Sequence, residues 1–161
     1  ISSWGLAQRL NISRKEGSDI KNQYFESYPD IKQYMDDCVE KAKKNGYAET
    51  LLGRRRYLRD INSRSSMQRS FAERNAVNAP IQGTAADIIK IAMVNIQQAM
   101  QDEKMDSKLI LQVHDELILD VLKDEAGEVK KLVKKHMETA MDLKVPLDVE
   151  MGEGNNWLEA H

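Results

Sequence analysis

Residues 109–121 have the sequence LILQVHDELILDV, and their pattern is the strongest indication of the fold class of this chain. The odd-numbered positions on both sides of His114-Asp115-Glu116 are apolar, which is the alternation of a β-strand with one buried face. A polar interruption between two such runs is typical of a hairpin turn. We therefore expect two antiparallel strands that hold His114, Asp115 and Glu116 at the end where they meet.

Helical patterns flank this hairpin on both sides. Ser13 and Glu16 have the spacing of a capping box, in which each side chain accepts a hydrogen bond from the other residue's backbone. Apolar side chains then recur at helical spacing up to Pro29, and Asp30 is expected to cap a second helix that ends at Gly46. The other expected elements are short strands over 47–50 and 56–58, a helix over 66–78 that ends before Pro80, a new helix from Thr84, a helix over 125–143 and a final strand over 147–151. This order predicts an α+β fold, with helices packed on a small antiparallel sheet.

The composition is that of an ordinary folded domain. Of the 161 residues, 31% are charged and 41% are hydrophobic, which excludes a disordered chain. No stretch reaches the roughly 20 apolar residues of a membrane span, so we expect no membrane partner. The single cysteine, Cys38, can form neither an internal disulfide nor a metal cluster, which favours a reducing, cytoplasmic location. Because the chain begins at Ile1 without an initiator methionine, we expect it to be a piece of a longer protein.

Positive charge is concentrated in one segment of the chain. Between Arg54 and Arg74 there are seven arginines and two acidic residues, although the whole chain has a net charge of −2. Guanidinium groups make forked hydrogen bonds to phosphate oxygens, so Arg54, Arg55 and Arg56 are candidate phosphate contacts. The alternative is that these arginines lie on a solvated surface and make ordinary ion pairs.

The tip of the expected hairpin is the best candidate for chemistry. Two hydrophobic strands would hold the carboxylates of Asp115 and Glu116 in place at the end of the sheet. Mg²⁺ takes one or two carboxylates from a protein and completes its shell with water and phosphate oxygens. Paired metal ions can hold both the attacking and the leaving oxygen of a phosphoryl transfer. On the tripeptide alone, an ordinary polar turn remains the alternative.

A row of hydrogen-bond donors is the second candidate feature. Arg74 and Asn78 are four residues apart, so they project from the same face of their helix. Gln82 follows the expected break at Pro80 and could continue the row. Such donors suit the minor groove of DNA, whose acceptors are alike for all base pairs. A solvated helix flank is the alternative.

Three separated segments resemble one family in sequence and in order. They are residues 50–58 (TLLGRRRYL), 73–90 (ERNAVNAPIQGTAADIIK) and 111–117 (LQVHDEL), and the similarity extends to 145–147 (VPL) and 154–157 (GNNW). Together they resemble the A family of DNA polymerases, to which the bacterial polymerase I enzymes belong. The resemblance covers nearly the whole chain.

The resemblance implies a role for each candidate residue. Asp115 would be the palm carboxylate that binds the catalytic Mg²⁺ ions, two in the intact enzyme, with Glu116 in support and His114 near the primer terminus. The DNA contacts that it implies are Arg74, Asn78 and Gln82 on the minor-groove side near the growing end, and Arg54, Arg55 and Arg56 along the backbone. Gln112 is a further expected DNA contact. The reaction would be template-directed attack of a primer 3′-hydroxyl on the α-phosphorus of a dNTP, which releases pyrophosphate.

The resemblance also implies which parts of the enzyme are present. Residues 1–46 would be the remaining helices of the fingers, and residues 47–161 most of the palm. The family's second metal-binding aspartate, and the fingers helix whose Lys, Arg and Tyr grip the triphosphate, would belong to a missing N-terminal part. We therefore expect primer–template DNA, dNTP and that missing part as partners, and we expect this chain alone to be inactive.

Two functions other than DNA synthesis are compatible with parts of this sequence. A non-catalytic module that binds primer–template DNA would use the arginines and would leave the acidic tip without a role. A metal phosphohydrolase built on His114-Asp115 would need further His and Asp ligands, and only His136 and His161 remain as histidines. The sequence disfavours the phosphohydrolase and keeps the binding module as the alternative.

Overall fold

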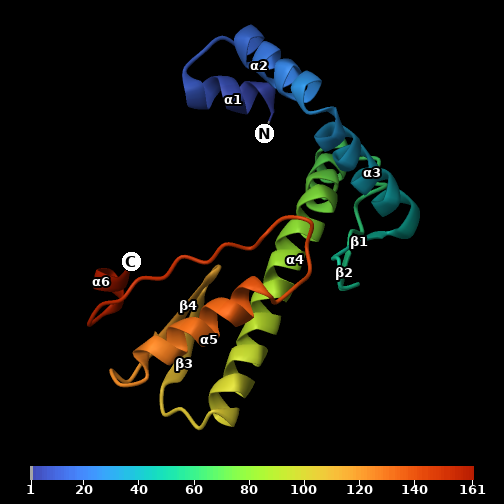
Figure 1. The fold of residues 1–161 in the computed structure, drawn as a ribbon. Helices are drawn as coiled ribbons and strands as arrows, with labels where there is room; N and C mark the ends of the chain where they lie inside the picture. Colours follow the sequence, from blue (N-terminus) through green and yellow to red (C-terminus); the bar gives the residue numbers. More distant parts are fainter. Residues whose placement is uncertain (1) are drawn as a thin grey trace. The chain divides into compact units, whose positions relative to one another are not determined.

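The structure is a computed structural model that describes residues 2–161, and the chain forms two compact units (Figure 1). The first unit comprises Ile1–Glu49, of which Ile1 lies outside the described residues, and Gly53–Pro80. The second unit comprises Thr50–Leu52 and Ile81–His161. None of the helices in the described part of the chain is long and apolar enough to cross a bilayer.

The first unit opens with three helices, α1 (Ser3–Leu10), α2 (Arg14–Ser27) and α3 (Pro29–Asn45). The capping box before α2 is confirmed, because Ser13 Oγ accepts from Glu16 N at 3.2 Å and Ser13 N donates to Glu16 Oε2 at 2.9 Å. Gly46 ends α3 with a positive φ of 80°, as predicted. The prediction that Asp30 caps α3 is wrong. The helix begins one residue earlier, at Pro29, whose fixed φ suits a first helical position, so Asp30 lies inside the first turn.

The predicted hairpin after α3 is also confirmed. Strand β1 (Tyr47–Glu49) pairs antiparallel with β2 (Arg55–Tyr57), and Ala48 is paired with Arg56. This hairpin contributes to the core of the first unit, which is formed by Ala42, Ala48, Leu58, Ile61, Ala72, Ala76 and Ala79. Most of these side chains are small, so the elements that carry them can approach closely.

Helix α4 (Ser66–Asp102) corrects the predicted break at Pro80. The helix continues through Pro80 and Thr84, so neither the expected end at Asn78 nor the expected new start at Thr84 is present. Proline inside a helix removes one backbone hydrogen bond and costs about 3 kcal/mol. Alanines before Pro80 and apolar residues after it are buried in hydrophobic cores, and this packing outweighs the local preference.

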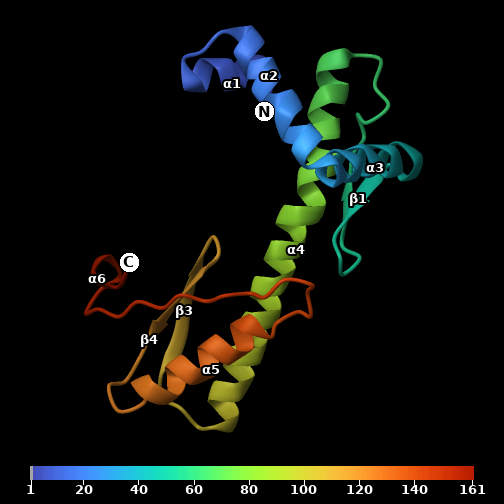
Figure 2. The ribbon, with the colours of Figure 1, turned by 45° about the horizontal axis from the view of Figure 1, so that its top comes forward.

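The second unit contains the predicted hairpin at 109–121. Strand β3 (Lys108–Val113) pairs antiparallel with β4 (Glu116–Asp120), and helix α5 (Ala126–Glu138) follows. Both views show α5 and this hairpin alongside the C-terminal half of α4 (Figures 1 and 2). Leu117 and Leu119 of β4 pack against a core formed by Ala92, Ile96, Met100, Val129, Leu132 and Val133.

A bulge between Leu109 and Leu111 changes which side of β3 faces this core. Beyond the bulge, Leu111 pairs with Ile118 and Gln112 pairs with Leu117. Paired residues share a face, so Gln112 lies on the side of Leu117, and Leu111 lies on the opposite side. The expectation that all odd positions are buried is therefore wrong for Leu111, whose side chain is 49% exposed.

The C-terminal region departs from two further predictions. Helix α5 ends at Glu138 and not at residue 143, and its C-cap Thr139 donates both its N–H and its hydroxyl to Lys135 O. The strand expected over 147–151 is wrong, since these residues alternate in polarity but pair with no strand in the described part of the chain. The chain ends with the short helix α6 (Trp157–Ala160). The α+β fold with small antiparallel sheets, one in each unit, is confirmed.

Candidate functional site

The tip of the β3–β4 hairpin consists of His114 and Asp115. Val113 pairs with Glu116 directly below the tip, so both carboxylates stay close to the last backbone pair. His114 has a positive φ of 55°, which a non-glycine residue rarely adopts outside tight turns. The Gln112 side chain donates from Nε2 to His114 O at 2.8 Å and braces this backbone. The turn thus presents the Asp115 side chain at the end of a hairpin whose base is packed in a core.

The two carboxylates differ in their surroundings. Asp115 is exposed, whereas Glu116 is partly exposed and its Oε1 lies 3.3 Å from Nδ1 of His161. Both side chains of this pair are accessible, at 42% for Glu116 and 66% for His161, so the contact adds little to stability. Nothing in a local sequence pattern connects His161 with the tip, so this contact could not be predicted from the sequence.

The donors at the tip fit the way in which proteins hold Mg²⁺. An exposed carboxylate with a second one beside it leaves room for water and phosphate oxygens to complete the octahedral shell. Among residues 2–161, no group of three or more His, Cys, Asp or Glu side chains is gathered around one point. That arrangement suits an ion shared with a substrate, and it gives no support to the His-rich cage of a metal phosphohydrolase.

The three hydrogen-bond donors on α4 follow one another at more regular helical spacing than the sequence predicted. Because the helix continues through Pro80, Gln82 lies one helical step beyond Asn78, as Asn78 does beyond Arg74. All three side chains are exposed. The guanidinium of Arg74 also lies 5.7 Å from the centre of the Phe71 ring, which limits the directions that its stem can take.

The three consecutive arginines are not equivalent. Arg55 Nε donates to Glu49 Oε2 at 2.8 Å, and its guanidinium lies 4.5 Å from the centre of the Tyr47 ring. The hydrogen bond with Glu49 raises the pKa of Arg55 above its ordinary value. The charge of Arg55 is thus compensated within the hairpin by Glu49, although all three arginines are exposed.

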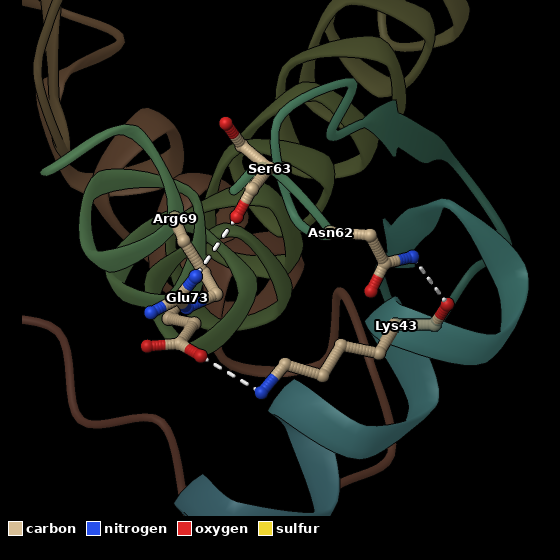
Figure 3. A network of polar contacts seen from close by, with 5 residues as sticks. All are labelled: Lys43, Asn62, Ser63, Arg69 and Glu73. Carbon is tan, nitrogen blue, oxygen red and sulfur yellow. Dashed lines mark hydrogen bonds and ion pairs between the residues drawn. The ribbon is translucent and has the colours of Figure 1, made fainter. Parts of the chain in front are cut away.

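Part of the basic segment serves the structure of the first unit (Figure 3). Arg69 Nη1 donates to the backbone oxygen of Ser63 at 2.9 Å, and Lys43 Nζ lies 2.8 Å from Glu73 Oε1. Asn62 Nδ2 donates to Lys43 O at 3.1 Å. These contacts join α3, the segment before α4 and α4 itself. The sequence could not separate such arginines from those that remain available for a ligand.

The β3–β4 hairpin presents carboxylates at its tip and packs against helices at its base. This arrangement suits Mg²⁺-dependent chemistry on phosphate groups.

Comparison with known protein families identifies the chain's own family. The family model of DNA polymerase family A matches residues 1–159, and the chain belongs to that family. It is 52% identical over 160 residues to DNA polymerase I of Bacillus caldotenax and to that of Geobacillus stearothermophilus. These matches cover 99% of this chain but only 18% of the length of each relative.

A solved structure supports the same family. The chain is similar, with a TM-score of 0.96 and 48% identity, to the POL domain of Pol1 from M. smegmatis in complex with DNA primer-template and dNTP. The match covers 99% of this chain and 28% of the other. The resemblance found in the sequence and the fold class are both confirmed by these comparisons.

Proposed function

We propose that this chain carries the catalytic hairpin of a DNA-directed DNA polymerase. The observation that supports the proposal is the exposed carboxylate tip, held by a packed base, on a chain of family A. The reaction is nucleotidyl transfer, in which a primer 3′-hydroxyl attacks the α-phosphorus of a dNTP and pyrophosphate leaves. We place it in the cytoplasm, with primer–template DNA and dNTP as its partners.

In this proposal Asp115 binds the metal ions and Glu116 supports the site. Bound Mg²⁺ supplies charge neutralisation at the transferring phosphoryl group. We propose that His114, which forms the turn together with Asp115, contacts the primer terminus. The exposed position of the Asp115 carboxylate leaves it accessible to an ion that is also bound to substrate oxygens.

The DNA contacts follow from the exposed donors. We propose that Arg74, Asn78 and Gln82 contact the minor groove near the growing end, where their donors meet acceptors common to all base pairs. We propose that Gln112 of β3 also contacts the DNA, and its amide nitrogen donates to His114 O. The arginines of the 54–56 segment follow the phosphate backbone, and Arg56 carries more of that role than Arg55, whose charge is compensated by Glu49.

We propose that residues 1–46 belong to the fingers and residues 47–161 to the palm of the intact enzyme. Two Mg²⁺ ions then require a second aspartate from a part of the enzyme outside these residues. With Asp115 and Glu116 alone, this chain does not polymerise. Primer extension with the purified chain tests this point, and clear Mg²⁺-dependent extension would contradict it.

The test of the proposed function is Asp115→Asn in the full-length parent polymerase. Removing a metal ligand that stabilises transition-state charge by several kcal/mol lowers the incorporation rate by about 10³-fold or more. Affinity for primer–template stays within about twofold. Asp120→Asn, an exposed aspartate at the other end of β4, is the matched control and keeps near-normal turnover. Near-normal turnover of Asp115→Asn would refute the metal role.

The alternative is a non-catalytic module that binds primer–template DNA. The exposed donor row on α4 favours it for the isolated chain, because these donors need no metal. Binding of primer–template by the purified chain that weakens steeply with salt would support the module. Absence of binding at any salt concentration would exclude it.

A further inference from the structure

The base of the β3–β4 hairpin, opposite its tip, is closed by a side chain to which the proposed reaction assigns no role. Glu125 Oε1 accepts from Asp106 N at 3.0 Å, and Glu125 Oε2 accepts from Ser107 N at 2.9 Å and from Ser107 Oγ at 2.5 Å. Ser107 Oγ in turn accepts from Leu122 N at 3.0 Å. One carboxylate and one hydroxyl therefore join the residue before β3 to the segment after β4.

The hydrogen bonds between Glu125 and Ser107 are strong. Ser107 is only 6% exposed, and a hydrogen bond to an ionised carboxylate is about twice as strong as a neutral one. The hydrogen bond from the Ser107 hydroxyl is the main cause that lowers the pKa of Glu125, so the carboxylate is ionised at neutral pH. Glu125 is also the N-cap residue of α5, yet its side chain makes no capping bond there. Its hydrogen-bonding capacity is directed to the base of the hairpin instead.

The position of the tip depends on how the two strands are paired. The bulge between Leu109 and Leu111 already shifts β3 by one residue against β4. A further slip of one residue would move every later side chain of the strand to the other face. Contacts that fix Lys108 opposite Asp120 at the base therefore also determine where β4 begins and where Asp115 lies.

We propose that Glu125 is a positioning residue for nucleotidyl transfer, which fixes the base of the hairpin and thereby the place of the Asp115 carboxylate. This role rests on the proposed function, in which Asp115 holds Mg²⁺. Glu125 itself does not touch the metal or the substrate, because its carboxylate is engaged at the opposite end of the hairpin.

The experiment compares Glu125→Ala with Glu128→Ala in the full-length parent polymerase. Glu128 is an exposed carboxylate in the first turn of the same helix, so its removal matches the change in charge. A displacement of about 1 Å at the reacting groups, caused by a mutation far from them, can cost about 100-fold in rate, and we expect a loss of about 10–100-fold in single-turnover incorporation for Glu125→Ala. The Mg²⁺ concentration for half-maximal rate rises, while affinity for primer–template stays within about twofold. Glu128→Ala changes neither the rate nor the Mg²⁺ dependence beyond that limit.

A purely structural role would give a different pattern. It would lower only the melting temperature of Glu125→Ala. Well below that temperature, the rate and the Mg²⁺ dependence of Glu125→Ala would then equal those of Glu128→Ala, and this result would overturn the proposal. If Glu125→Ala does not fold, Ser107→Ala removes the hydroxyl and keeps both backbone donors, and Ser107→Thr retains a hydroxyl. We expect a smaller loss of rate for Ser107→Ala and its recovery in Ser107→Thr, and equal rates for Ser107→Ala and wild type would overturn the proposal.

The two proposals fail in different ways. Absence of Mg²⁺-dependent incorporation by the wild-type parent would refute the proposed function and, with it, this role. Normal incorporation by the wild type together with a normal rate in Glu125→Ala would refute the positioning role alone.

Discussion

The hydroxyl of Thr84 in α4 accepts a hydrogen bond of 3.1 Å from the backbone N–H of Leu51. The turn that joins β1 to β2 is thus attached to the helix by a side chain that is only 8% exposed. The same residue had been expected to start a helix. Its hydroxyl instead satisfies a backbone donor of a segment that is distant in the sequence.

Thr84→Val should destabilise the chain, because it keeps the shape of the side chain but removes the acceptor for Leu51 N–H. We expect the free energy of unfolding to fall by about 0.5–1.5 kcal/mol, the net contribution of a typical hydrogen bond, because water can reach the N–H of the exposed Leu51. Urea unfolding measures the change. Thr84→Ser retains the hydroxyl and should lose less, so an equal loss in both variants would show that the methyl group and not the hydrogen bond is responsible.

Pro80→Ala should stabilise the chain. Position 80 lies inside a continuous helix, where alanine is favoured over proline by about 3 kcal/mol in simple hosts. We expect a gain of about 1–3 kcal/mol in the free energy of unfolding, measured in urea.

Pro29→Ala is the matched control for that gain. Pro29 stands at the first position of α3, where proline's fixed φ is favourable and its missing N–H costs nothing. This variant should therefore give no gain. A loss of stability in Pro80→Ala would indicate that the proline ring itself is required for packing at that point of α4.

The arginines of β2 should differ in DNA binding. Arg56→Gln should reduce the slope of log affinity against log salt by about one, because it removes one exposed phosphate contact. The double variant Glu49→Gln/Arg55→Gln removes a pair whose charges already compensate each other, so its salt slope should equal that of the wild type. Titrations of a labelled primer–template with the chain at several salt concentrations measure both slopes. A larger change in the double variant would contradict the assignment of Arg55 to the hairpin.

Stability should fall in acid partly through Glu125. Hydrogen bonds from Ser107 and Asp106 lower its pKa in the folded chain below the ordinary value of 4.5. A group whose folded pKa is lowered contributes stability above its unfolded pKa, and this contribution is lost as the pH falls through the folded pKa. The decrease in the free energy of unfolding from about pH 6 to about pH 3 should therefore be smaller in Glu125→Gln than in the wild type. Glu128→Gln should show the same decrease in the free energy of unfolding as the wild type. An equal decrease in all three proteins would show that Glu125 does not contribute to the loss of stability in acid.

Much of the local structure was predictable from the sequence. The capping box at Ser13 and Glu16, the end of α3 at Gly46 and the hairpin at 109–121 depend on residues only a few positions apart. Side-chain period, capping and turn geometry act over the same short range, so their pattern can be recognised without the tertiary structure. The same holds for the tip, because two apolar strands leave His114-Asp115-Glu116 at the turn.

The departures occur where distant parts of the chain compete with local preference. Burial of apolar residues before and after Pro80 maintains the helix against the proline, and this places Gln82 in one row with Arg74 and Asn78. The bulge in β3 moves Leu111 to the exposed face, which periodicity could not indicate. Residues 147–151 show that alternation does not make a strand when no neighbouring strand supplies hydrogen bonds.

The family, the α+β class and the carboxylate tip could be predicted from the amino-acid sequence alone, since these depend on motifs, on residue order and on short-range periodicity. Which charged side chains pair with one another within the chain is visible only in the three-dimensional structure. It attached Arg55 to Glu49, placed Glu116 beside His161 and joined Ser107 to Glu125. Such pairs form between residues that folding brings together, and hydrogen-bond geometry selects among many possible partners only after the backbone is in place.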